Sequence, residues 1–195
     1  MQIAIQILRF AHILAVVFMA WPLYGLIAVN ERGRLGSPLG EWADRYMENI
    51  IKAQSMRCYI YQLTAGVTGL ALVYFRGFAL SSFFTNWVLA AKTILLLTLM
   101  GLLSYVHLSL QPRIDALFAQ AGTNAVPEDL GAQVSVLRVR RKRLAATCLF
   151  LVITTVLLGL QVYARFNPLL SLALVVLTAL FVWRAYRTSI RFGWV

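Results

Sequence analysis

Residues 144–187, LAATCLFLVITTVLLGLQVYARFNPLLSLALVVLTALFVWRAYR, decide the fold of this chain. The stretch holds two apolar runs, at about 144–166 and 168–187. Each is near the roughly 20 residues that a helix needs to cross a bilayer core of about 30 Å. Asn suits the position just before a helix and Pro its first residue, so Asn167-Pro168 predicts a new helix from Pro168. The stretch is therefore predicted to form two antiparallel membrane-spanning helices.

Three more apolar stretches lie upstream, at about 3–29, 57–79 and 84–110. With 61% hydrophobic and 13% charged residues, the composition excludes an ordinary soluble domain. The first stretch is longer than the apolar part of a secretory signal, and Arg9 is the only cation in residues 1–10. It also lacks a good cleavage site, so we interpret it as a transmembrane helix and not as a secretory signal. The predicted fold class is all-α: a polytopic membrane helix bundle, with five transmembrane helices in a single domain over residues 1–195.

Lysine and arginine are unevenly distributed over the predicted loops. Five lie in the 29–57 loop, six in the 111–143 loop and three in the C-terminal tail, out of 18 in the chain. Loops rich in Lys and Arg stay on the cytoplasmic side of a membrane. Both long loops and the C-terminus are therefore predicted to be cytoplasmic and the N-terminus outside, in a bacterial-type inner membrane. An odd number of spans agrees with this orientation.

The first cytoplasmic loop is predicted to contain an amphipathic helix. Ser37-Pro38 is typical of a helix start. After it, apolar side chains recur every three or four residues, and charged side chains fill the opposite face. The apolar positions are Leu39, Trp42, Ala43, Tyr46 and Ile50, and the charged positions are Glu41, Asp44, Arg45 and Glu48. Such a helix either lies along the membrane or covers the inner mouth of the bundle.

The second cytoplasmic loop leads from a helix start at Pro127 into the basic cluster Arg138–Arg143, just before the fourth span. A basic cluster at this position sets topology and attracts anionic lipid headgroups. The bilayer, and anionic lipid at Arg138–Arg143, are therefore the expected partners. The net charge of +11 is interpreted as this topology signal. No nucleic-acid partner is expected, because the aromatic and fold context of such proteins is missing.

Ionisable side chains at membrane depth are the first candidates for function, because a cation in hydrocarbon is costly and usually functional. Arg9 and His12 lie in the first span and Lys92 in the third. At 1.5 Å per residue, His12 and Lys92 are roughly 14 and 11 Å below the outer face, so they share a level if these spans touch. Lys92 either turns outward to the headgroups or holds an anion such as a haem propionate or a lipid phosphate.

The remaining candidate ligands are few. The second histidine, His107, is roughly 20 Å deeper than His12, which argues against one haem bound by both. His12 and Met19, seven residues apart, share a helix face, and this pair suits copper; the alternative is that Met19 packs in the core. Cys58 and Cys148 have no metal-binding spacing and are interpreted as buried, inert thiols. No acidic residue in the spans can orient a histidine for nucleophilic catalysis.

Two stretches also resemble a known superfamily. Residues 8–17, Leu-Arg-Phe-Ala-His-Ile-Leu-Ala-Val-Val, and 86–92, Asn-Trp-Val-Leu-Ala-Ala-Lys, are similar to the first and third helices of copper resistance D-type proteins, HemJ-type protoporphyrinogen oxidases and related membrane proteins. In HemJ-type enzymes the first-helix histidine and third-helix lysine are functional and haem is implicated; the matching positions are His12 and Lys92. The chain departs from those enzymes at Ala20–Leu23, where a small-residue turn is usual, and at Arg143–Ala146, where an Asn-Glu-x-Pro motif is usual.

Three functions stay open on this basis. The departures favour a non-enzymatic, copper resistance D-like inner-membrane protein, which handles a metal or haem or serves as an accessory subunit of a larger membrane complex. There His12 would be the ligand, Lys92 and Arg9 would hold anionic groups, and Met19 would be a further metal ligand. The alternatives are a HemJ-like oxidoreductase that acts on porphyrinogen, and a purely structural subunit that contacts other membrane chains. The cofactors implied by the resemblance are haem b or copper.

Overall fold

The computed structural model describes residues 2–29, 42–79, 81–121, 126–161 and 166–187. Within these ranges the chain is helical and contains no strand. The helices are α1 (Gln2–Val29), α2 (Trp42–Phe75), α3 (Ser82–Thr85), α4 (Trp87–Tyr105), η2 (Val106–Leu110), α5 (Gln111–Ala121), α6 (Glu128–Leu160) and α7 (Pro168–Arg187). Five helical segments in this part of the chain are long and apolar enough to cross a membrane. The predicted all-α class with five candidate transmembrane helices is confirmed.

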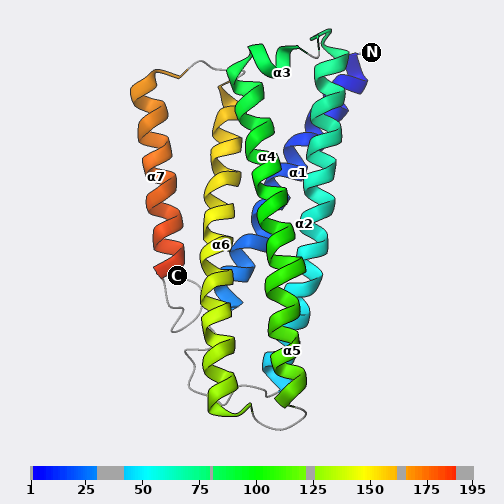
Figure 1. Ribbon diagram of the computed structural model, residues 1–195. Coiled ribbons are helices and arrows are strands. Elements are labelled where there is room, and N and C mark those ends of the chain that lie inside the picture. Colours follow the sequence, from blue (N-terminus) through cyan, green and yellow to red (C-terminus); the bar gives the residue numbers. More distant parts are fainter. Residues whose placement is uncertain (1, 30–41, 80, 122–125, 162–165, 188–195) are drawn as a thin grey trace.

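Four helices form the core of the bundle (Figure 1). Helix α1 packs against α2 and α6, and α4 also packs against α2 and α6, so α1 and α4 lie on opposite faces of the α2–α6 pair. Helix α7 packs mainly against α6 and stands at the edge of the bundle. Apolar side chains fill the interior, among them Met19, Leu99 and Val152, which are at most 1% exposed.

Local sequence explains where the helices of the two hairpins begin. Helix α7 begins at Pro168, and the Asn167 side chain accepts a hydrogen bond from the Leu169 N–H at 3.1 Å. Asn86 caps α4 in the same way, through the N–H groups of the second and third residues that follow it. Both caps satisfy backbone donors that have no partner inside the helix. The helix start predicted at Asn167-Pro168 is confirmed.

Helix α2 ends four residues before the predicted end of the second span. Gly77 has a φ of 72°, a conformation that glycine adopts without steric cost. The Phe78 N–H donates to the Val73 carbonyl at 3.2 Å and the Gly77 N–H donates to the Tyr74 carbonyl at 3.0 Å. These two bonds form a Schellman motif, which closes the helix and turns the chain toward α3.

The third span continues past its predicted end. Helix α4 passes through the π-helical turn η2 into α5, and the combined segment ends at Ala121 instead of near residue 110. Pro112 explains the π-turn, because it has no N–H to donate to the Leu108 carbonyl and its ring crowds that carbonyl. One wider turn removes the clash and lets the helix continue.

The segment between the first and second predicted spans differs from its prediction. Residues 42–75 form one continuous helix, α2, instead of an amphipathic helix followed by a separate span; the predicted start at Ser37-Pro38 lies outside the described residues. Asp44 and Glu48 were expected on a polar outer face, yet they are 0% and 5% exposed, while Tyr46 is 54% exposed. The expected polarity of this face is therefore wrong. The physical reason is that both carboxylates pair with arginines of α6.

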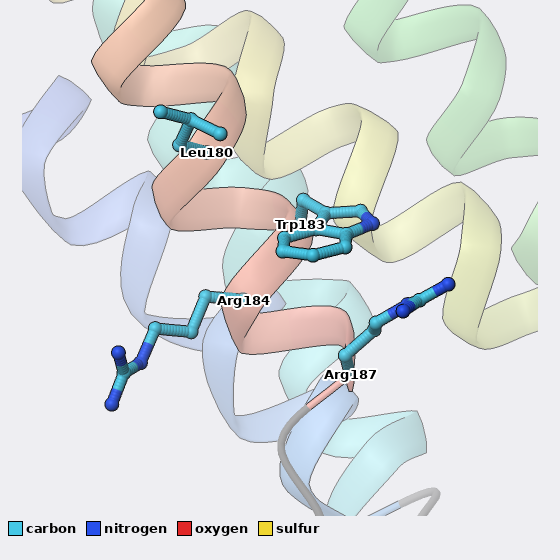
Figure 2. Close-up of a pocket in the computed structure, with 4 residues that line it drawn as sticks. All are labelled: Leu180, Trp183, Arg184 and Arg187. Atoms are coloured by element: carbon cyan, nitrogen blue, oxygen red, sulfur yellow. The ribbon is translucent and has the colours of Figure 1, made fainter.

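The C-terminal end of α7 presents an open depression lined by Leu180, Trp183, Arg184 and Arg187. Figure 2 shows Trp183 and Arg187 on one side of the helix and Arg184 on the other. The Arg187 guanidinium carbon lies 4.7 Å from the centre of the Trp183 ring. A tryptophan beside arginines is typical of a helix end at a membrane–water interface.

Candidate functional site

The ring of His12 projects from α1 against α2. His12 Nδ1 and the Thr68 hydroxyl oxygen lie 2.9 Å apart. Because Thr68 already donates its hydroxyl proton to the Thr64 carbonyl, the Thr68 oxygen is the acceptor and His12 Nδ1 the donor. Nδ1 therefore carries the proton, and Nε2 keeps its lone pair. An imidazole anchored through one nitrogen, with the other able to bind, is the usual form of a metal-ligating histidine.

A glycine allows this close approach of His12 to α2. A Cβ atom at Gly69 would lie 3.1 Å from His12 Cε1, tighter than most such contacts in proteins. Gly66 is adjacent and faces α4, where a Cβ atom would lie 3.5 Å from Leu96 Cδ2. Small residues let membrane helices and their side chains approach closely. These two glycines therefore leave room for His12 and for α4 to approach the same part of α2 closely.

Lys92 enters the bundle from the opposite side. It lies on α4, and its Nζ would be 3.4 Å from a Cβ atom at Gly159 of α6. His12 lies against Gly69 of α2, whereas Lys92 lies against Gly159 of α6. Because α1 and α4 pack mainly against α2 and α6, different helices position the two residues.

The other two candidates of the first span behave differently. Arg9 is partly buried on α1, one turn before His12. Met19 is 1% exposed and belongs to the apolar core. Seven residues, or about 10 Å along a helix axis, separate it from His12. The copper pair of His12 and Met19 stays a prediction.

His107 lies in a different part of the bundle. It is in η2, and its ring meets Tyr59 of α2 edge-on with 5.9 Å between ring centres. Tyr59 and Thr68, the α2 contacts of the two histidines, are nine residues apart, roughly 14 Å along the helix. This separation prevents both histidines from ligating one iron. His107 Nδ1 is buried and has no hydrogen-bond partner among the described residues.

A second polar cluster, which sequence reasoning missed, joins α2 to α6 at the lower end of the bundle in Figure 1. Arg141 Nη1 donates to Glu48 Oε2 at 2.7 Å, and Arg138 Nη2 donates to Glu48 Oε1 at 2.9 Å. Arg138 Nη1 also donates to Asp44 Oδ1 at 3.1 Å. All four side chains are at most 6% exposed. Two guanidinium groups thus neutralise two carboxylates in the interior.

We call the cluster of Asp44, Glu48, Arg138 and Arg141 the inner ion network. Helix α5 extends it. Gln111 accepts a hydrogen bond from Arg141 at 2.7 Å and donates to Glu48 and to Asp115, each at 3.2 Å. Asp115 in turn pairs with Lys52 at 2.9 Å, in a part of the network that is half exposed. The network therefore ties α2, α5 and α6 together with equal numbers of acidic and basic groups.

The sequence contains the spacing of acidic and basic residues that forms this network, but the spacing does not predict which residues pair. Asp44 and Glu48 are four residues apart, and Arg138 and Arg141 are three apart, so each pair lies on one helix face. About 90 residues separate the acidic pair from the basic one, and nothing local says that the two faces meet.

The basic cluster before the fourth span is only partly exposed. Arg138 and Arg141 serve the inner ion network, and Lys142 is 5% exposed with its Nζ 4.6 Å from the centre of the Tyr186 ring. Arg140 and Arg143 remain exposed. Of the cluster expected to attract lipid headgroups, these two are the side chains that solvent or headgroups can reach.

Comparison of the chain with family models, with curated proteins and with solved structures finds no match in any of the three. The functional argument therefore depends on the residues and geometry described above.

Proposed function

We propose that this protein is a non-enzymatic, copper resistance D-like membrane protein that binds haem b through His12 Nε2. The hydrogen bond to Thr68 carries the proposal, because it fixes the tautomer that leaves Nε2 able to ligate a metal. Lys92, and Arg9 one turn from His12, would supply cations for the propionates. Bound haem would supply a redox-active iron; the chain would hold and orient it.

The available donors fit haem better than copper. Haem iron needs one axial ligand from the protein, together with cations near its carboxylates. Copper in a histidine and methionine site needs several ligands around one ion. Met19 is two turns from His12, and the described residues contain no group of three or more His, Cys, Asp and Glu that could hold a metal. Haem is therefore the cofactor that we carry forward.

A visible absorption spectrum of the purified protein from haem-replete cells tests the proposal. We expect a Soret band whose visible bands sharpen on reduction with dithionite. A preparation that contains copper but no haem contradicts haem binding and favours a copper-binding protein instead. A colourless, metal-free protein that co-purifies with other membrane chains favours a structural or accessory subunit. Haem-dependent oxidation of protoporphyrinogen would favour the HemJ-like enzyme.

We also propose the orientation in the membrane. The inner ion network and the exposed Arg140 and Arg143 would face the cytoplasm, in a bacterial inner membrane, with the N-terminus outside. The support is the concentration of Lys and Arg in the loops at this end of the bundle. In this orientation Arg140 and Arg143 lie where anionic lipid headgroups are most abundant.

Cysteine labelling tests this orientation. In a variant that lacks both native cysteines, Ser81→Cys is expected to react with a membrane-impermeant maleimide on intact cells, because the exposed Ser81 lies in the outer hairpin. Gln120→Cys, equally exposed at the end of α5, is expected to react only after lysis. The opposite pattern would invert the proposed topology, and labelling at both sites in sealed cells would contradict it as well.

A further inference from the structure

A small cavity lies between the helices of the four-helix core. His12 is not on its wall, and neither are Lys52 and Asp115, the exposed part of the inner ion network. Its volume is about 30 Å³, and all four core helices, α1, α2, α4 and α6, contribute to its wall. A space of this size holds one small ion or one water molecule and excludes an organic cofactor. Facing helices of a four-helix bundle often build metal sites at this position.

Both cysteines of the chain line this cavity. Cys58 comes from α2 and is 2% exposed; Cys148 comes from α6 and is 5% exposed. Both are free thiols. Two buried thiol side chains from two different helices therefore line one small space.

Three polar side chains share the cavity wall: Gln62, Arg141 and Ser55, whose hydroxyl donates to the Ile51 carbonyl at 3.2 Å. Gln62 is 2% exposed, and its Nε2 donates to Cys58 Sγ at 3.8 Å. Its Oε1 is buried and has no hydrogen-bond partner among the described residues. Arg141, the inner ion network's most buried arginine, also lines the cavity. An unpartnered buried amide oxygen is unfavourable unless something occupies the space beside it.

We propose that this cavity is a binding site for a single soft monovalent cation of the Cu(I) or Ag(I) type, held between the thiolates of Cys58 and Cys148. Soft thiolate ligands select such ions, and two thiolates suffice for linear coordination. Binding converts one cation and two thiols into an anionic bis-thiolate complex and releases two protons. Arg141, which lines the cavity, would then balance that negative charge. The site is independent of the proposed haem site.

Titration of the full-length protein in detergent with Ag(I), which stays monovalent in air, tests this assignment. We expect one ion bound per chain, measured by mass spectrometry of metal content after desalting, with two protons released in weakly buffered solution. Cys58→Ser and Cys148→Ser are each expected to weaken binding on the order of 100-fold, because thiolates dominate the affinity for soft ions. The double variant is expected to bind none.

Matched controls separate this site from other soft ligands. Met19→Leu removes a core thioether that is not on the cavity wall, and His12→Ala removes the proposed haem ligand; both are expected to keep one Ag(I). If a serine variant does not fold, judged by size-exclusion chromatography, the corresponding alanine variant replaces it. Stoichiometric binding by the cysteine-free protein would overturn the assignment. The assignment would also be overturned if the folded wild-type protein binds no Ag(I), which would favour a cavity that holds only water.

Discussion

Arg141→Leu is expected to lower the free energy of unfolding by about 3–5 kcal/mol, because removing one partner from a buried ion pair leaves an uncompensated charge in the interior. Arg141 is 1% exposed and donates to Glu48 and to Gln111, each at 2.7 Å. In the variant, two buried carboxylates share the single guanidinium of Arg138. Unfolding in detergent micelles, followed by circular dichroism against temperature or added SDS, measures the change.

The same helix offers a matched control. Arg140 is exposed, and its guanidinium carbon lies 5.3 Å from the centre of the Tyr105 ring. Arg140→Leu is expected to cost only about 0.5–1 kcal/mol, the usual strength of an exposed cation–π contact. If the two leucine variants lose equal stability, the inner ion network does not hold the helices together as we infer.

Removing a whole pair is expected to cost less than removing half of it. Glu48→Leu combined with Arg141→Leu leaves Arg138 with Asp44, a pair with no net charge. Replacing a buried ion pair by apolar side chains is often neutral or stabilising. The double variant is therefore expected to be more stable than Arg141→Leu alone. A double variant that is less stable than Arg141→Leu would show that packing, and not charge balance, dominates here.

His12→Ala is expected to abolish the Soret band of the purified protein. The chain has two histidines, and the geometry separates them by roughly 14 Å along α2, so His107 cannot take over as ligand at the same place. The measurement is the ratio of Soret to protein absorbance, together with pyridine haemochrome content. Retention of the full haem content in this variant would exclude His12 as the ligand.

Three further variants separate ligation from orientation. His107→Ala is the control, and it is expected to keep the haem. Thr68→Val keeps the side-chain shape but removes the acceptor for His12 Nδ1, and it is expected to weaken binding by about 10–100-fold, as loss of a partner that orients a ligand does. Lys92→Met is expected to weaken binding while the position of the Soret band stays unchanged, because it removes a cation near the propionates and not the ligand to iron.

Much of the fold could be predicted because the relevant physics is local. Apolar runs of sufficient length predicted the spans, and Asn167 with Pro168 predicted the start of α7 to the residue. The continuation of α4 through a π-turn into α5 was not predicted, since the apolar stretch of the third span ends near residue 110. Single-residue signals thus located helix starts better than helix ends.

The candidate site could be predicted only in part. Counting residues placed His12 and Lys92 at similar depth, and the expectation that they form one site stays a prediction. The contacts were different, because α1 and α4 each pack against α2 and α6. Thr68, which orients His12, and Gly69, which makes room for it, lie on a helix that residue counting did not connect with the first span.

The sequence by itself determined the number of candidate spans, the cap of α7 and the charge asymmetry of the loops. All of these depend on residues within a few turns of one another or on composition. Only the tertiary structure decided that Asp44 and Glu48 face Arg138 and Arg141, and that Cys58 and Cys148 line the same cavity. Helical periodicity specifies which residues share a face. Which faces meet depends on how the helices pack, and that packing is fixed by contacts between side chains about 90 residues apart in the sequence.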